Sequence, residues 1–161
     1  MVIVMSAAID AVTAAGIPHR VIRHEPAGSL AEAAQRQGVE IRDIAKTIVV
    51  RRGDGDFVFV LVPGDRVISW PKLRVLLGVN RLSMPDAATA KAATGYERGT
   101  ITPFGSRTRW PVIADDRLRG RTVNLGAGER GVGIRVAADD VVGALDGSFA
   151  DVTDPEPAGP R

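Results

Sequence analysis

Residues 94–105, TGYERGTITPFG, carry the residue types best suited to ligand chemistry in this chain. The segment has three glycines and one proline, with hydroxyl side chains between them and no aliphatic run. Gly99 and Gly105 can adopt backbone angles closed to other residues, while Pro103 fixes one torsion and donates no hydrogen bond. Such a loop can present backbone N–H groups and small hydroxyls to a ligand. A structural turn explains the same composition, and composition alone does not decide between the two.

Lys46 is a second candidate because it precedes the apolar run 47–50. A lysine at this point should bury its aliphatic stem and direct its ammonium into a cleft or to solvent. The simplest interpretation is a lysine at a strand edge. The functional alternatives are an anchor for a phosphate or carbonyl oxygen, or a Schiff-base amine, which would need a depressed pKa.

Two other patterns have weaker functional interpretations. Residues 126–131, GAGERG, match the dinucleotide-binding fingerprint, but that fingerprint needs a following helix and residues 133–136 predict a strand. We therefore expect a turn between two strands. The two histidines, His19 and His24, occur without cysteine, so we expect no metal site and no cofactor.

The arginines of the second half could bind phosphate, because the guanidinium fork matches its geometry. A solvated arginine surface explains them equally well, and a formal net charge of +2 does not indicate a nucleic-acid binder. These arginines are Arg98, Arg107, Arg109, Arg117, Arg119, Arg121, Arg130 and Arg135.

The elements that would position these residues alternate without a regular βαβ rhythm. Helices are predicted over 7–15, from Ser29 to Gly38, from Ser69 to Leu77, from Asp86 to Thr94 and over 139–145. Strands are predicted over 47–50 and 57–62, joined as a hairpin, and over 111–114, 122–125 and 133–136. The mixture favours an α+β domain with a largely antiparallel sheet or barrel.

Length and composition indicate one domain with a proper hydrophobic core: 161 residues, 45% hydrophobic and 25% charged. The absence of cysteine excludes disulfides and thiolate catalysis. We see no signal peptide and no stretch long enough to span a bilayer, so we expect no membrane contact and a cytoplasmic location. Residues 1–147 should form the domain. Residues 148–161, rich in proline, are expected to be a disordered tail.

The order of motifs resembles the YbaK/ProX family of aminoacyl-tRNA deacylases, the prolyl-tRNA-synthetase-associated editing-domain family. The resemblance rests on Lys46-Thr47, residues 73–78, the Thr-Gly-Tyr-x-x-Gly-x-x-x-Pro-Phe-Gly loop of 94–105, residues 111–115 and residues 124–128. It covers the chain from about Ala8 to Leu145. It implies an α+β fold with a mixed, mostly antiparallel, barrel-like β-sheet surrounded by helices.

The resemblance also implies an activity, a partner and a site. The activity is trans-editing: hydrolysis of the ester that joins a wrong amino acid to tRNA, often tRNA-Pro. The implied partner is the acceptor end of aminoacyl-tRNA, with an aminoacyl-tRNA synthetase as a further candidate; the oligomeric state is not implied. The expected catalytic residues are Lys46, Gly99, Thr100, Ile101, Thr102 and Pro103. The expected substrate-binding residues are His24, Thr47, Tyr96, Phe104, Gly105, Asn124, Gly126 and Gly128.

The residues agree with such chemistry. An aminoacyl ester is already activated, so fixed N–H groups that stabilise its oxyanion can supply much of the catalysis. The attacking group could be water, the 2′-hydroxyl or the substrate's own side chain. Thr100 and Thr102 stand where family members often carry glycine and serine, which predicts a tighter pocket. A non-catalytic module that binds tRNA or a synthetase, and a hydrolase of small esters, remain alternatives.

Overall fold

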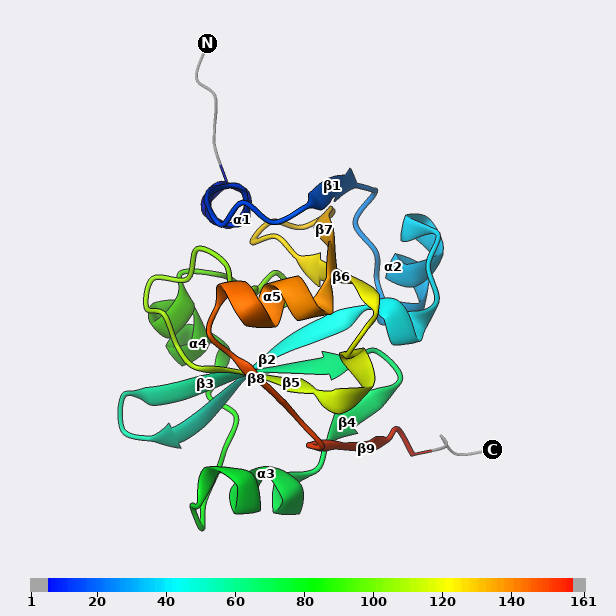
Figure 1. Cartoon of the computed structure of the whole chain (residues 1–161). Coiled ribbons are helices and arrows are strands. Elements are labelled where there is room, and N and C mark those ends of the chain that lie inside the picture. The colour runs from blue at the N-terminus through cyan, green and yellow to red at the C-terminus, as the bar shows by residue number, and fades with distance from the viewer. Residues whose placement is uncertain (1–5, 158–161) are drawn as a thin grey trace.

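The computed structural model describes residues 6–157 and shows an α+β arrangement of two main sheets with helices around them (Figure 1). The helices are α1 (Ala7–Ala14), α2 (Leu30–Gln37), α3 (Trp70–Leu77), α4 (Ala87–Thr94) and α5 (Ala138–Ala144), with short 3₁₀ turns at Ile41–Asp43 and Asp116–Leu118. The strands are β1 (His19–Arg23), β2 (Ala45–Gly53), β3 (Asp56–Pro63), β4 (Arg66–Ile68), β5 (Val112–Asp115), β6 (Thr122–Gly126), β7 (Val132–Ala137), β8 (Ser148–Ala150) and β9 (Thr153–Pro155). The predicted fold class is confirmed.

The central sheet has the order β2-β3-β5-β8 and separates two cores. β2 and β3 form the predicted antiparallel hairpin, whereas β5 and β8 join in parallel. Residues 57–62 of β3 are all apolar because both faces of the strand are covered: Phe57, Phe59 and Leu61 enter the first core, and the intervening valines enter the second.

The second sheet, β1-β7-β6, is antiparallel and covers the first core together with α1, α4 and α5 (Figure 1). It approaches the central sheet where Ile44 bridges to Asn124, beside the outer edge of β2. On the other side, α3 and the pair β4–β9 cover the second core. This arrangement leaves most of the edge of β2 between the two sheets.

Capping side chains begin the helices where the sequence predicted. The hydroxyls of Ser29 and Ser69 and the carboxylate of Asp86 each accept the N–H three residues ahead, at the starts of α2, α3 and α4. Gly38 and Gly78 end α2 and α3 in the left-handed conformation. These boundaries depend only on neighbouring residues, which explains why the sequence alone located them.

The prediction of a disordered tail from residue 148 is wrong for residues 148–155, which form β8 and β9. Strand β8 pairs in parallel with β5, and β9 pairs antiparallel with β4. The physical reason is Val152, a fully buried member of the second core whose carbonyl accepts the Ser69 N–H at 2.8 Å. Residues 158–161 lie outside the described part of the chain, as do residues 1–5.

Candidate active site

A cavity of about 450 Å³ lies between the edge of β2, the end of β6 and the loop 98–101. Helix α2 and the segment before it line one side, and Met84 to Ala90 contribute another. Its walls are largely apolar, with contributions from Leu30, Ala33, Ile44, Val49, Ala90 and Leu125. The volume is that of a small-molecule site.

The edge of β2 presents backbone groups along this cavity. Arg51 exchanges both of its backbone hydrogen bonds with Ser83, at 2.7 and 3.1 Å, on the side away from β3. In an antiparallel ladder such residues alternate, so Val49 and Thr47 also direct their N–H and C=O groups away from β3. Both residues line the cavity, which therefore has main-chain donors and acceptors on one wall.

Thr47 adds a hydroxyl to the same wall. Its Oγ1 is buried and has no hydrogen-bond partner among the described residues. A buried hydroxyl without a partner costs about 1–3 kcal/mol, so a ligand that supplies one gains from it. The structure thus places Thr47 in the cavity wall, and its role in binding substrate stays a prediction.

The loop contributes its first half to the cavity. The N–H and the Oγ1 of Thr100 both donate to the carbonyl of Glu97, at 3.0 and 2.7 Å, and close a turn in which Gly99 has a φ of +89°. This turn leaves the N–H groups of Gly99 and Ile101 without an acceptor among residues 6–157. Gly99, Thr100 and Ile101 all line the cavity.

The second half of the loop is buried instead. Thr102, Pro103 and Phe104 are covered by the first core and its surroundings, and they are not part of the cavity wall. Tyr96 is buried as well and donates from its hydroxyl to the carbonyl of Phe104 at 2.6 Å. Burial raises the pKa of the Tyr96 phenol.

These contacts correct several of the site expectations. The side chains of four expected site residues are buried and do not line the cavity: Tyr96, Thr102, Pro103 and Phe104. Gly105 has a structural role, because a Cβ there would lie 2.5 Å from the backbone of Ala7. Thr102 is fully buried and is not part of the cavity wall, so of the two threonines expected to narrow the pocket only Thr100 lines it.

The glycine-rich residues 126–131 form the turn of the β6–β7 hairpin, as predicted, with a strand and not a helix after them. A Cβ on Gly128 would lie 2.5 Å from the Tyr96 ring, and one on Gly131 would lie 2.5 Å from the carbonyl of His24. Gly126 lines the cavity, whereas Gly128 does not. The expectation that Gly128 binds substrate is corrected: it makes room for Tyr96.

Asn124 lies in the cavity wall with its side chain already engaged. Its Nδ2 donates to Oε1 of Gln37 at 2.7 Å, and its Oδ1 accepts from Arg135 at 3.0 Å. These bonds tie α2 to β6 and β7 at the junction of the two sheets. Sequence analysis missed Gln37, because a glutamine in the last turn of a helix carries no signal by itself.

Lys46 also belongs to the cavity lining, but its ammonium is held on the β4 side. Its Nζ donates to the carbonyl of Arg66 at 2.7 Å. Its partner across the hairpin is Val62, so its side chain leaves the opposite face of β2 from that of Thr47. Burial lowers the pKa of Lys46, and the carboxylates of Glu156 and Asp65 oppose this effect.

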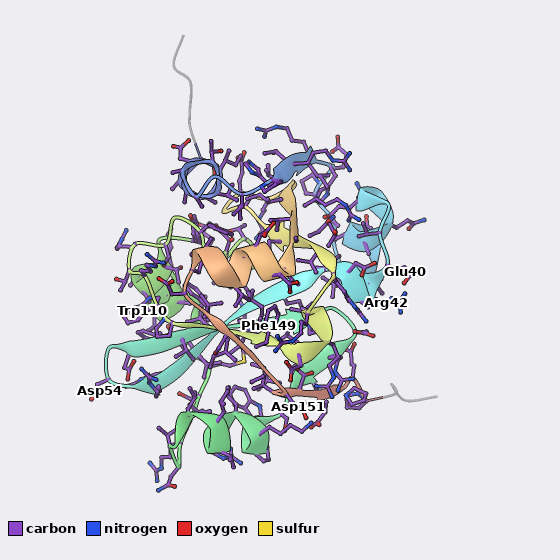
Figure 2. The ribbon with its side chains drawn as sticks, viewed as in Figure 1. Glu40, Arg42, Asp54, Trp110, Phe149 and Asp151 are labelled. Atoms are coloured by element: carbon purple, nitrogen blue, oxygen red, sulfur yellow. The ribbon has the colours of Figure 1, made fainter. Side chains whose placement is uncertain are left out.

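Charged side chains surround the mouth of the cavity. His24 lies on one side, its Nδ1 2.8 Å from the carbonyl of Glu25. Arg98 and Arg130 come from the two glycine-rich segments. Many other arginines are neutralised by acids, as in the pair Arg51–Asp54 and the pair Arg42–Glu40, which lies at the periphery of the molecule (Figure 2). Arg98 and Arg130 have no such partner within residues 6–157.

No three His, Asp or Glu side chains between residues 6 and 157 gather as metal ligands. None of the helices in that range is long and apolar enough to cross a bilayer.

Comparison with known proteins places this geometry in a family. The family model described as "Aminoacyl-tRNA editing domain" matches residues 24–143. The Enterococcus faecalis protein named "Putative Cys-tRNA(Pro)/Cys-tRNA(Cys) deacylase EbsC" is 29% identical over 134 residues, which are 83% of this chain and 80% of that protein. A proline–tRNA ligase from Desulfovibrio desulfuricans is 38% identical over 96 residues, which are 60% of this chain and only 16% of the ligase.

Solved structures agree with these sequence relatives. The structure named as that of "a putative trans-editing enzyme for prolyl tRNA synthetase" has a TM-score of 0.81 at 25% identity, covering 90% of this chain and 93% of that one. The hypothetical protein APE2540 has a TM-score of 0.83 at 26% identity, covering 91% and 98%. The family model spans well over half of the sequence, including the cavity and the loop beside it. The chain therefore belongs to the aminoacyl-tRNA editing domain family, of the YbaK type.

Proposed function

We propose that this chain is a trans-editing deacylase that hydrolyses the ester of mischarged aminoacyl-tRNA, with tRNA-Pro carrying a wrong amino acid such as cysteine or alanine as the substrate. The enzyme class, aminoacyl-tRNA deacylase, follows from membership of the family. The tRNA and the amino acid are inferred from the name of the E. faecalis relative and from the likeness to proline–tRNA ligases.

The observation that carries the proposal is the pair of free amides beside the cavity. The N–H groups of Gly99 and Ile101 flank Thr100, whose own amide closes the turn on Glu97. Two fixed donors of this kind can stabilise the oxyanion that forms when the ester carbonyl is attacked. Each such donor is worth about 10²–10³-fold in rate.

The opposite wall can orient the aminoacyl group. The carbonyls of Thr47 and Val49 at the edge of β2 are suitable acceptors for the α-ammonium, and the Thr47 hydroxyl is free to bind the ester or the attacking group. An aminoacyl ester needs no strong nucleophile, so a positioned water, the 2′-hydroxyl or the substrate side chain can attack. We assign Lys46 to the terminal phosphate or to the charge that develops in the transition state.

The tRNA itself would meet Arg98 and Arg130. Both are exposed, both line the cavity mouth, and neither is neutralised by a described acid. Exposed guanidinium groups that form no ion pair with a described acid can bind the phosphates of a single-stranded 3′ end. A synthetase is a second possible partner, because relatives of this chain occur inside proline–tRNA ligases.

The direct test is release of labelled amino acid from mischarged tRNA-Pro, with alanine, cysteine, serine and threonine as the loaded residues and Pro-tRNA-Pro as the control. We expect turnover of at least one mischarged species and a clear loss in Lys46→Ala, with folding checked by circular dichroism. Equal rates for the variant and the wild type would remove Lys46 from the mechanism.

The other outcomes of the same assay point elsewhere. Salt-sensitive tRNA binding without turnover of any species would indicate a non-catalytic module. Hydrolysis of small aminoacyl esters at the same efficiency as aminoacyl-tRNA would indicate an esterase without a tRNA requirement.

A further inference from the structure

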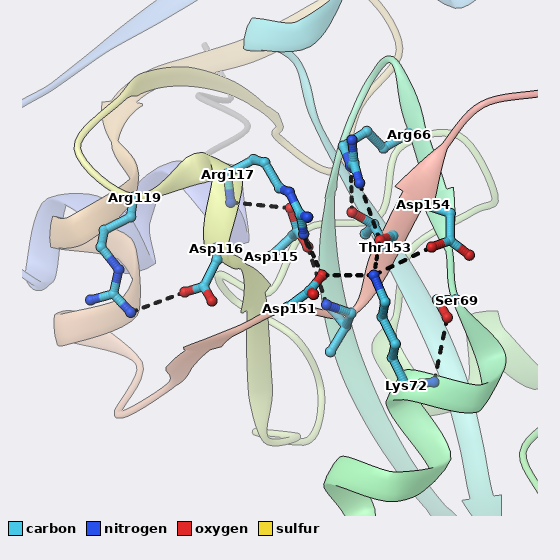
Figure 3. A network of polar contacts seen from close by, with 11 residues as sticks. Arg66, Ser69, Lys72, Asp115, Asp116, Arg117, Arg119, Asp151, Thr153 and Asp154 are labelled. Atoms are coloured by element: carbon cyan, nitrogen blue, oxygen red, sulfur yellow. Dashed lines mark hydrogen bonds and ion pairs between the residues drawn. The ribbon is translucent and has the colours of Figure 1, made fainter.

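Residues 148–156, here called the C-terminal strap, lie beyond the part of the chain that the family model matches. The strap comprises β8, the turn at Asp151 and Val152, β9 and Glu156. It crosses the second core and is held by the polar network of Figure 3. Nothing in the proposed chemistry yet involves it.

The strap is anchored at its centre. The fully buried carboxylate of Asp115 accepts the N–H of Val152 at 3.2 Å and the guanidinium of Arg117 at 3.2 Å. Arg117 also pairs with Asp151 (Figure 3). From the other side, Nζ of Lys72 in α3 donates to the carbonyl of Thr153 at 3.0 Å and lies 3.1 Å from Asp151. The position of the strap is thus fixed from two directions.

Arg66 connects the strap to the cavity. Its Nε donates to Oγ1 of Thr153 at 2.7 Å, and a terminal nitrogen donates to the Thr153 carbonyl at 3.2 Å. The backbone carbonyl of this same Arg66 accepts Nζ of Lys46 at 2.7 Å. The acceptor that holds the Lys46 ammonium is therefore a backbone carbonyl of β4. This strand pairs with β9, and its residue Arg66 is hydrogen-bonded to Thr153 of β9.

The strap also contributes charge. Glu156, just after β9, donates its N–H to the carbonyl of Asp65 in the β3–β4 turn at 3.2 Å, and the carboxylates of both residues act on Lys46. The guanidinium of Arg66, on the neighbouring strand β4, donates to Thr153. Burial disfavours the charged form of Lys46, and the two carboxylates favour it.

We propose that the C-terminal strap is a positioning element of the deacylase site: Thr153 and Arg66 fix the carbonyl that holds the Lys46 ammonium, and the strap places the carboxylate of Glu156, with that of Asp65, beside this ammonium. The proposal rests on the role given to Lys46 in the proposed function. It makes Arg66, Thr153 and Glu156 positioning residues, since each acts through Lys46.

The first test measures Lys46 without any substrate. The chain has only three lysines, Lys46, Lys72 and Lys91, so a pH titration of ¹³C-labelled lysine side chains by NMR can follow each one, with Lys46→Arg as the assignment variant. We expect Glu156→Gln to lower the pKa of Lys46. The matched control is Asp154→Asn, which removes a carboxylate of the same strap that lies 3.3 Å from Nζ of Lys72. This variant should lower the pKa of Lys72 and leave the pKa of Lys46 unchanged. An unchanged pKa of Lys46 in Glu156→Gln would show that the Glu156 carboxylate does not act on Lys46.

The second test measures catalysis. Thr153→Val removes the hydroxyl that clamps Arg66 and keeps the shape of the side chain, so we expect roughly a tenfold fall in kcat from a misplaced ammonium. Thr153→Ser keeps the hydroxyl and should restore kcat. In Glu156→Gln, the alkaline limb of the pH–rate profile should move to lower pH. Wild-type kcat in Thr153→Val, or an equal fall in Thr153→Ser, would overturn the positioning role.

The two tests separate the proposal from the function on which it rests. If the wild type releases no amino acid from any tRNA, the proposed function fails, while the titration still decides whether the strap acts on Lys46. If Thr153→Val does not fold, the titration and the pH profile of Glu156→Gln decide the proposal by themselves.

Discussion

The two glycine-rich segments, the loop 94–105 and the turn 126–131, look alike in composition and differ in what their glycines do. In the turn, Gly128 and Gly131 have no room for a Cβ, because Tyr96 and the His24 carbonyl occupy that space. In the loop, Gly99 faces open space at a φ of +89°. Gly99 thus marks a backbone conformation beside the cavity, whereas Gly128 and Gly131 mark close packing, as Gly105 does at the far end of the loop.

The two segments also support each other. The N–H of Gly128 donates to the carbonyl of Thr100 at 2.9 Å, and Gly126 approaches the carbonyls of Thr100 and Ile101. The turn therefore fixes the part of the loop that presents free amides. The loop therefore presents amides to the cavity and the turn supports the loop, although the two segments have similar compositions.

The sharpest way to break this comparison is to add the same methyl group to each segment. Gly128→Ala should lower the free energy of unfolding by about 3–5 kcal/mol, because its Cβ would collide with the Tyr96 ring at a φ of +81°. Gly99→Ala meets no atom and should lose about 1–2 kcal/mol from its backbone angle alone. Urea denaturation measures both.

Deacylation by the same variants completes that experiment. Gly99→Ala should remain folded and lose activity, because strain at Gly99 displaces the donor amides. Gly78→Ala, with a positive φ of +67°, no atom within 4 Å of the added Cβ and no part in the cavity wall, is the control for backbone strain without a change at the site. Equal stability losses in Gly99→Ala and Gly128→Ala would contradict the division between the segments.

The role of Tyr96 can be sharpened by removing one oxygen. Tyr96→Phe leaves the buried carbonyl of Phe104 without its donor, so we expect a stability loss of about 1–3 kcal/mol in thermal or urea unfolding. The KM for aminoacyl-tRNA should stay at the wild-type value, since Tyr96 does not line the cavity. A raised KM in the folded variant would return Tyr96 to the substrate-binding residues.

Each segment supplies one arginine to the cavity mouth, and these should act alike. Arg98→Gln and Arg130→Gln should each reduce the slope of log affinity for tRNA against log salt by about 1, without a loss of stability. Arg109→Gln is the matched control, because Arg109 is exposed and paired with Asp146 at 3.1 Å. Filter binding at several salt concentrations measures the slopes, and a response to only one of the two arginines would show that the segments are not equivalent.

The smallest effect is expected at two buried hydroxyls that have no partner among the described residues, Thr102 in the loop and Thr47 in β2. Thr102→Val should keep stability or raise it by up to about 1 kcal/mol, and should keep activity. Thr47→Val should also keep stability but lower the deacylation rate, because Thr47 lines the cavity. Loss of activity in Thr102→Val alone would reverse the assignment of these hydroxyls.

Local features of the fold could be predicted from the sequence because their causes are local. The caps at Ser29, Ser69 and Asp86 and the glycine ends of α2 and α3 depend on residues within one helical turn. The β2–β3 hairpin and the burial of both faces of β3 follow from an uninterrupted apolar run. The turn at 126–131 follows from the strand pattern after it.

What the sequence could not predict depends on distant partners. β8 and β9 are short, and their burial comes from Val152 and from pairing with strands far back in the chain. The separation of the loop into a cavity half and a buried half depends on where Tyr96 meets Gly128. The direction in which the Lys46 side chain points depends on its hydrogen bond to the Arg66 carbonyl, which no sequence pattern around residue 46 indicates.

The late position of the strap in the chain has a consequence for how the protein forms. Arg66 pairs with Pro155, and Ile113 pairs with Ser148, so the central sheet and the second core are completed only by the last described residues. Contacts of such long sequence separation slow folding, because loop closure must precede the gain from pairing. A nascent chain synthesised only as far as α5 would carry an incomplete sheet edge along β5 and a second core without Val152. Activity should therefore appear only after synthesis has passed residue 156, and a refolding assay should show the Lys46 site maturing in the final phase.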